Sequence, residues 1–140
     1  MATRSTIAVQ HADESISVIY CHWDGYISNN GRLLEINYTS LELAEALVDG
    51  GSLSILGEYI QPIGAHSFDS PEDNCCVYYG RDRAELDCEP NIYPSLADYL
   101  YMHDYQDYNY LFKDGAWWLM NHNRTDDELL ADVLMNCLND

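Results

Sequence analysis

Basic residues are scarce in this chain. Its 140 residues contain six lysines and arginines against 24 aspartates and glutamates, which gives a formal net charge of −18 at pH 7 and a pI near 4.2. Proteins grip a nucleic-acid backbone by neutralising its phosphates with Lys and Arg. The composition therefore argues against direct binding to nucleic acid and to an anionic membrane. A basic protein surface is the natural electrostatic partner of such a chain.

Long apolar runs are also missing. A membrane-spanning helix needs about 20 consecutive apolar residues, and no run approaches this length. The first ten residues lack the apolar core of a secretory signal. The five cysteines are odd in number, and two of them are adjacent, as is typical of reduced thiols rather than a disulfide framework. We therefore expect a protein of the cytoplasm with no membrane partner.

Motifs of known chemistry are absent as well. The chain has neither C-x-x-C nor H-x-x-x-H, so its five histidines and five cysteines predict no metal site. It also lacks a P-loop and the G-x-S-x-G turn of serine hydrolases. The sequence accordingly predicts no catalytic residue and no cofactor. An enzyme of unrecognised type remains one of the alternatives.

The patterns that are present predict a fold. The length fits one domain, which we place at residues 1–140. Residues 5–11 and 16–22 carry apolar side chains at alternate positions, Ile7 and Val9 in the first segment and Ile16, Val18 and Tyr20 in the second, and a polar loop joins them as in a hairpin. A second hairpin is predicted from 109–112 and 116–120, which are joined by a short loop containing Asp-Gly.

Helices are predicted from capping signals. Thr39 stands three residues before Glu42 at the start of an apolar stripe that ends at Gly50-Gly51, and Thr125 and Glu128 repeat this spacing before the C-terminal stripe. Ser95 is the expected cap of a further helix, and a short helical piece is expected at 32–38. We therefore predict an α+β domain with a mostly antiparallel sheet and two or three helices, including an amphipathic C-terminal helix.

Tyrosine is concentrated in one segment. Residues 98–110 contain five tyrosines and three aspartates, more than one helix face can bury. Exposed tyrosine is enriched at interaction hot spots, and neighbouring aspartates can pair with Arg or Lys on a partner. The segment predicts a partner-binding surface made of Asp98, Tyr101, Asp104, Tyr105, Asp107 and Tyr108.

A second group of aromatic residues permits an alternative. The string YCHWDGY at 20–26 places aromatic rings and a histidine around a strand end and a turn, where they can stack a planar ligand. The closely spaced arginines in Arg81-Asp82-Arg83 are able to hold an anionic group. This hypothesis, a binder of a small molecule such as a nucleotide signal, uses Tyr20, His22, Trp23, Asp24, Tyr26, Arg81 and Arg83.

Three strings in the chain carry a family resemblance. Residues 3–8 (TRSTIA), residues 20–26 (YCHWDGY) and residues 79–83 (YGRDR) together resemble a family of small proteins encoded by tailed bacteriophages and prophages. The resemblance covers most of the chain and implies no catalytic residue. It implies a protein made in the cytoplasm of an infected host.

The leading hypothesis joins this context with the charge. Small acidic phage proteins often inhibit host defence enzymes by occupying a basic groove, as anti-CRISPR and anti-restriction proteins that mimic DNA do. By analogy we expect a non-enzymatic protein that binds the basic surface of a host protein, in particular a nucleic-acid-binding one. The alternatives are the small-molecule binder, the enzyme of unrecognised type and a minor component of the virion.

Overall fold

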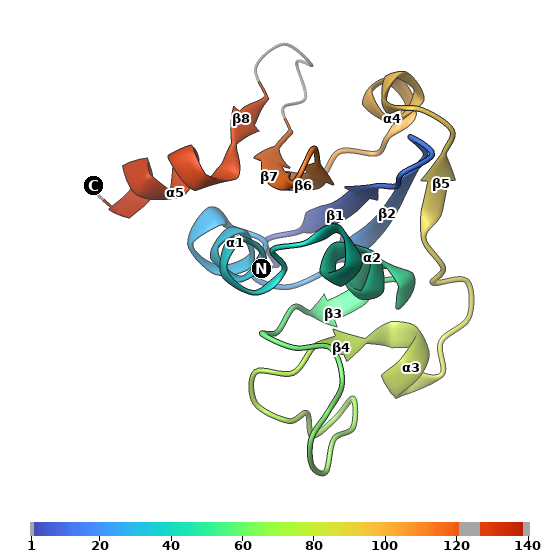
Figure 1. Cartoon of the computed structure of the whole chain (residues 1–140). Helices are drawn as coiled ribbons and strands as arrows, with labels where there is room; N and C mark the ends of the chain where they lie inside the picture. Colours follow the sequence, from blue (N-terminus) through green and yellow to red (C-terminus); the bar gives the residue numbers. More distant parts are fainter. Residues whose placement is uncertain (1, 121–126, 139–140) are drawn as a thin grey trace.

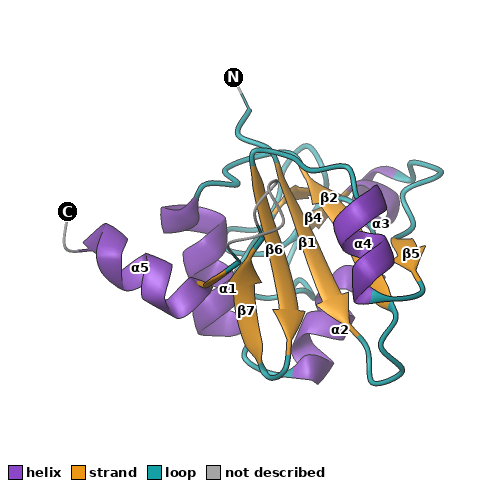
Figure 2. Cartoon of the chain, turned by 90° about the horizontal axis from the view of Figure 1, so that it is seen from above, coloured by secondary structure: helices purple, strands orange, loops and turns teal. Residues whose placement is uncertain are grey.

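One mixed sheet runs through the protein. The computed structural model describes residues 2–120 and 127–138. In these residues the strands follow the order β4-β3-β2-β1-β6-β7-β8, and β5 pairs with β2 beside this path (Figures 1 and 2). The strands are β1 (Ser5–Gln10), β2 (Ile16–Cys21), β3 (Leu53–Ile55), β4 (Val77–Tyr78), β5 (Asn91–Tyr93), β6 (Tyr108–Lys113), β7 (Ala116–Leu119) and β8 (Glu128–Leu129).

Both predicted hairpins are confirmed. β1 pairs antiparallel with β2, and β6 pairs antiparallel with β7. The central contact between the two hairpins is parallel, because β1 lies beside β6 with Ser5 opposite Tyr108 and Val9 opposite Phe112. β2 and β3 form the other parallel pair, and the remaining neighbours are antiparallel. The prediction of a mostly antiparallel sheet in an α+β domain is therefore correct.

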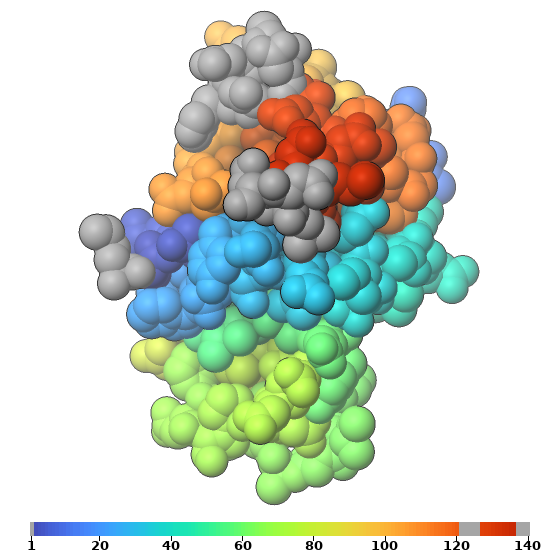
Figure 3. Space-filling model, turned by 90° about the vertical axis from the view of Figure 1, so that its left-hand side faces the viewer, coloured from blue at the N-terminus to red at the C-terminus, as the bar shows by residue number. Residues whose placement is uncertain are grey.

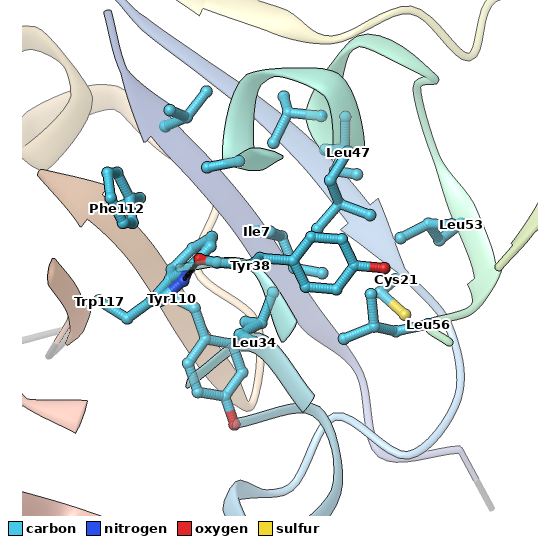
Figure 4. Packing of buried hydrophobic residues seen from close by; sticks show 14 of the residues in the cluster. Ile7, Cys21, Leu34, Tyr38, Leu47, Leu53, Leu56, Tyr110, Phe112 and Trp117 are labelled. Atoms are coloured by element: carbon cyan, nitrogen blue, oxygen red, sulfur yellow. Dashed lines mark hydrogen bonds between the residues drawn. The ribbon is translucent and has the colours of Figure 1, made fainter. Parts of the chain in front are cut away.

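Helices cover both faces of the sheet. The larger core lies under α1 (Arg32–Asn37), α2 (Leu41–Asp49) and α5 (Leu130–Leu138), whose apolar side chains meet those of β1 and β6 (Figure 4). Here the indole of Trp117 donates to the carbonyl of Tyr38 at 2.7 Å. On the opposite face α4 (Leu96–Met102) places Tyr99 against a smaller cluster around Ala8.

The number of helices is higher than predicted. The described residues form five α-helices and a π-helix, η1 (Ile27–Gly31), which leads directly into α1. The short α3 (Tyr79–Arg83) follows β4. No helix in the described part of the chain has the length and apolar character needed to cross a membrane.

Two predicted helix starts need correction. α2 is capped by Ser40, whose side chain accepts the amide hydrogen of Leu43, and not by Thr39. The C-terminal helix begins at Leu130, because Glu128 belongs to β8 and pairs with β7. The predicted cap Thr125 lies outside the described residues. The start of α2 is set by the side-chain cap of Ser40, and the start of α5 is set by the pairing of Glu128 with β7.

Candidate functional site

One cavity lies between residues 24–37, which include η1 and α1, on one side and residues 55–77 on the other. It has a volume of about 740 Å³ and is open to solvent. Figure 3 shows the face on which the blue segment containing η1 and α1 borders the green segment. We call this cavity the acidic groove. Four apolar residues that line it, which we call its floor, are Leu33, Ile36, Ile55 and Leu56, and five charged residues that line it, which we call its rim, are Asp24, Arg32, Glu58, Glu72 and Asp73.

Glu72 holds one wall of the acidic groove in shape. Its carboxylate accepts hydrogen bonds from the Tyr59 hydroxyl at 2.6 Å and from the amides of Ile63 and Gly64 at 3.0 and 2.5 Å. These hydrogen bonds, first that from Tyr59, lower the pKa of Glu72. A carboxylate with three donors closes its loop much as a capping residue closes a helix end. Glu72 is therefore a structural residue of the rim.

Two further contacts tie the same wall to α3. The His66 ring stands with Nε2 3.1 Å from a carboxylate oxygen of Asp82, and its Nδ1 accepts the amide hydrogen of Glu72 at 3.0 Å. Arg81 donates to the carbonyl of Ile60 at 2.7 Å and to that of Cys76 at 2.9 Å, and it pairs with Asp82. The structure thus uses Arg81, a predicted ligand residue, to fix the loop.

The opposite wall is fixed through η1 and Tyr38. Asn30, buried in η1, donates to the Ser5 hydroxyl at 3.1 Å and lies 3.4 Å from the sulfur of Cys21. The Tyr38 hydroxyl, just after α1, donates to the carbonyl of Gly57 at 2.7 Å. Single-turn π-helices occur frequently at functional sites. Since both walls are anchored, the acidic groove is preorganised.

Three rim carboxylates differ from Glu72. Within the described residues, the side chains of Asp24, Glu58 and Asp73 take part in no hydrogen bond or ion pair, and the same holds for the guanidinium of Arg32. The floor beside them is accessible, because Ile36 is 59% exposed and Ile55 is 37% exposed. Charged groups without internal partners stand here next to exposed apolar side chains.

The predicted ligand residues are divided among several places. Tyr20 and His22 form a hydrogen bond of 2.7 Å between the phenol oxygen and Nδ1, and the Trp23 ring packs edge-on against His22 with centroids 4.7 Å apart. Asp24 lines the acidic groove, while Arg83 lines a different cavity, of about 500 Å³. The residues predicted to bind the small-molecule ligand therefore do not all line one cavity.

Three residues of the predicted ligand set, Trp23, Tyr26 and Arg83, are exposed. Trp23 and Tyr26 have 42% and 40% of their surface accessible. Arg83 lies over the ring of Phe68, with the guanidinium carbon 5.2 Å from the ring centroid. Neither Trp23 nor Tyr26 lines the acidic groove, the cavity that Arg83 lines, or a third cavity beside His11.

Several residues of the predicted partner surface have structural roles. Ser95 caps α4 and donates to the Asp98 carboxylate at 2.9 Å. The Asp107 carboxylate accepts the amide hydrogen of Arg4 at 3.1 Å, which fixes the chain before β1. The Tyr105 hydroxyl donates to the carbonyl of Leu100. Tyr108 is half-buried against the larger core.

Three neighbouring residues, two at the end of α4 and one just after it, have exposed side chains. Tyr101 is 76% exposed and Met102 is 65% exposed, and Asp104 follows them on the surface. We call these three residues the α4 surface. Tyrosine and methionine are enriched at protein interfaces relative to the rest of the surface. The sequence predicted Tyr101 and Asp104 as part of a partner surface, and Met102 was not in that prediction.

One hydrogen-bonded chain resembles catalytic machinery. His11 Nε2 lies 2.7 Å from the Ser17 hydroxyl, and His11 Nδ1 lies 2.5 Å from a carboxylate oxygen of Glu45. This is the order of nucleophile, base and orienting acid. Ser17, however, is 6% exposed in the middle of a strand paired on both sides, and the cavity beside His11 does not include it. The chain therefore links the first hairpin to α2.

The described residues offer no obvious metal centre, since no three His, Cys, Asp or Glu side chains among them gather closely enough to hold an ion. Burial raises the pKa of the Cys75 thiol beside the acidic groove. A raised thiol pKa makes a poor nucleophile. The apolar side chains and carboxylates that line the acidic groove can bind a ligand noncovalently.

Sequence reasoning missed most of the acidic groove. Glu58, Ile55 and Asp73 lie outside the hairpins and helices predicted from the sequence, and Ile36 lies on the short helix expected at 32–38. The available signal was an apolar residue on the polar side of that helix. Compared with known proteins, the chain matches no family model, no curated protein and no solved structure. Its function must therefore be argued from its own residues.

Proposed function

We propose that this chain is a phage-encoded, non-enzymatic protein that binds the basic surface of a host protein and thereby inhibits or redirects it. The observation that carries the proposal is the α4 surface, where Tyr101 and Met102 are exposed beside Asp104 on a chain of net charge −18. Apolar contact supplies affinity at such a surface. The surrounding negative charge accelerates encounter with a basic partner and disfavours acidic ones.

The phage context comes from the sequence resemblance, and the choice of partner comes from the charge. A basic groove that normally holds nucleic acid is the kind of surface that this charge fits best. The partner is therefore expected among host nucleic-acid-binding proteins, including defence nucleases.

The test is capture of host proteins on the immobilised chain at low and high salt. The screening length is about 10 Å at 0.1 M salt and about 3 Å at 1 M, so a partner held by charge is released as salt rises. The double variant Tyr101→Ala/Met102→Ala is expected to lose the same partner, and the single variant Asp104→Asn is expected to weaken its binding about three- to fivefold. Leu86→Ala and Asp87→Asn are the matched controls, because both residues are exposed and lie elsewhere.

The choice of variants follows from the structure. Asp98 and Asp107 are left unchanged because they hold the α4 cap and the chain before β1, so their loss would mix folding with binding. A captured partner that is basic, salt-sensitive and lost or weakened only with the α4 variants supports the proposal. Capture that is unchanged in those variants, or unchanged at high salt, refutes it.

A further inference from the structure

We infer that the acidic groove is a second binding site, which takes a short extended segment of a partner protein carrying Lys or Arg on both sides of an apolar side chain. The inference deepens the proposed function and rests on it for the existence of a basic partner. The groove is distinct from the α4 surface, since none of the residues of that surface lines it.

The size of the cavity selects a segment rather than a folded face. At about 740 Å³ the acidic groove falls within the range of about 300–1,000 Å³ that holds a drug-sized ligand. A few side chains fit in this space, and a domain does not. The partner must therefore insert a protruding loop or a flexible tail.

The charge selects a basic segment. The rim carries four carboxylates, and those of Asp24, Glu58 and Asp73 have no internal partner within the described residues, whereas Glu72 is occupied by its own loop. An anionic ligand would meet a single cation, Arg32. Electrostatic complementarity of this kind excludes acidic segments and nucleic acid more strongly than it adds affinity.

The floor selects an apolar anchor. Ile36 and Ile55 leave apolar surface accessible among the charged residues that line the groove. Burying such surface under a leucine-sized side chain supplies affinity that salt does not screen. A polycation without an apolar side chain would leave the floor residues in contact with water and would bind more weakly.

The preorganised walls favour binding without rearrangement. Residues 59–76 are fixed by Glu72, by the His66–Asp82 contact and by Arg81. The Tyr38 hydroxyl, just after α1, donates to the carbonyl of Gly57. A site that is already ordered loses little entropy when its ligand arrives. The bound segment then bears most of the ordering cost, which gives a modest affinity that the α4 surface can raise through a second contact.

Fluorescence anisotropy with three labelled peptides of equal length tests the inference. The first peptide has two basic residues on each side of a central leucine, the second replaces the leucine with serine, and the third replaces the basic residues with glutamate. We expect the first to bind, the second to bind about tenfold more weakly, and the third not to bind.

Variants of the acidic groove locate the binding. Glu58→Gln and Asp73→Asn are each expected to weaken the first peptide about three- to fivefold, the upper range for an exposed ion pair, and Ile36→Ser is expected to remove most of the leucine preference. Asp87→Asn and Leu86→Ser are the matched controls for charge and for apolar surface, and both should bind normally. All of these side chains are exposed, so the fold is retained.

Each outcome decides the question. Equal binding of the basic leucine and serine peptides, or binding that survives the groove variants, overturns the inference. A chain that self-associates in light scattering and becomes monomeric on Ile36→Ser, with no peptide bound, also overturns it and assigns the groove to a second copy. If the peptides fail while capture through the α4 surface holds, the inference alone is wrong. If capture fails while the groove variants abolish peptide binding, the proposed function is wrong and the groove stands.

Discussion

A single methyl group at Gly57 tests whether the acidic groove is rigid. A Cβ at this position would lie 2.4 Å from the carbonyl oxygen of Asn74, 2.5 Å from the carbonyl carbon of Cys75 and 2.7 Å from the amide nitrogen of Cys76. All three are backbone atoms, so no side-chain rotation relieves the contact. Gly57→Ala must separate the end of β3 from the start of β4.

The expected magnitude follows from these contacts. Overpacking in a well-packed region costs about 1–3 kcal/mol, and the loss of unfolded-state entropy returns about 0.4–1 kcal/mol. We expect a net destabilisation of about 1–2 kcal/mol. With a urea slope of about 1–3 kcal/mol/M for a small domain, the unfolding midpoint falls by roughly 1 M.

Urea unfolding followed by tryptophan fluorescence measures this shift, because Trp117 is buried at 2% exposure and reports on the larger core. Gly80→Ala is the matched control. Its nearest neighbour for a new Cβ is the carbonyl oxygen of Glu85 at 3.8 Å, and it lies inside α3, so the same substitution should stabilise by about 0.5–1 kcal/mol. Gly57→Ala at wild-type stability would refute the rigid wall and the preorganisation argument.

Three further predictions concern single side chains. Ser40→Ala should cost about 0.5–2 kcal/mol through the lost cap of α2, while Thr39→Ala should stay near wild type in the same urea assay. Ala84 ends α3 in the left-handed conformation with φ 56°, so Ala84→Gly should raise the thermal midpoint by the equivalent of about 1 kcal/mol. Glu72 has a lowered pKa in the folded state because of its hydrogen bond from Tyr59, so its stabilisation is present above the unfolded pKa of 4.5 and is lost as pH falls through the lower folded value. The urea midpoint of Glu72→Gln should therefore lie below wild type at neutral pH and converge with it in acid. A constant gap down to the lowest pH would contradict this role of Glu72.

The sequence was most informative where structure is local. Alternation at 5–11 and 16–22 and the Asp-Gly turn after 109–112 depend on neighbouring residues, and both hairpins formed as predicted. Helix starts were less certain because two hydroxyl residues, Thr39 and Ser40, are adjacent and both have the capping chemistry. Which of them caps depends on the backbone geometry of the whole entry turn.

Long-range pairing could not be read from the sequence. The parallel contact of β1 with β6 joins residues about a hundred positions apart, and nothing in either strand identifies its partner. Glu128 fits a capping pattern in the sequence, but in the structure it belongs to β8 and pairs with β7. The acidic groove has the same origin, since its two walls come from residues 24–37 and 55–77 and meet only through the sheet.

The structure also changes what the negative charge means. The aspartates at 98–107 were predicted to act together on a partner, but Asp98 belongs to a helix cap and Asp107 holds a backbone amide, which leaves Asp104 outward. Asp24, Glu58 and Asp73, which line the acidic groove, also have side chains without an internal partner in the described chain. Charge that only kept the protein soluble would need no apolar floor beneath it. Because Ile36 and Ile55 are exposed and line the groove together with these carboxylates, the distribution of charge fits the two separate contacts that we propose with a basic partner better than one acidic face.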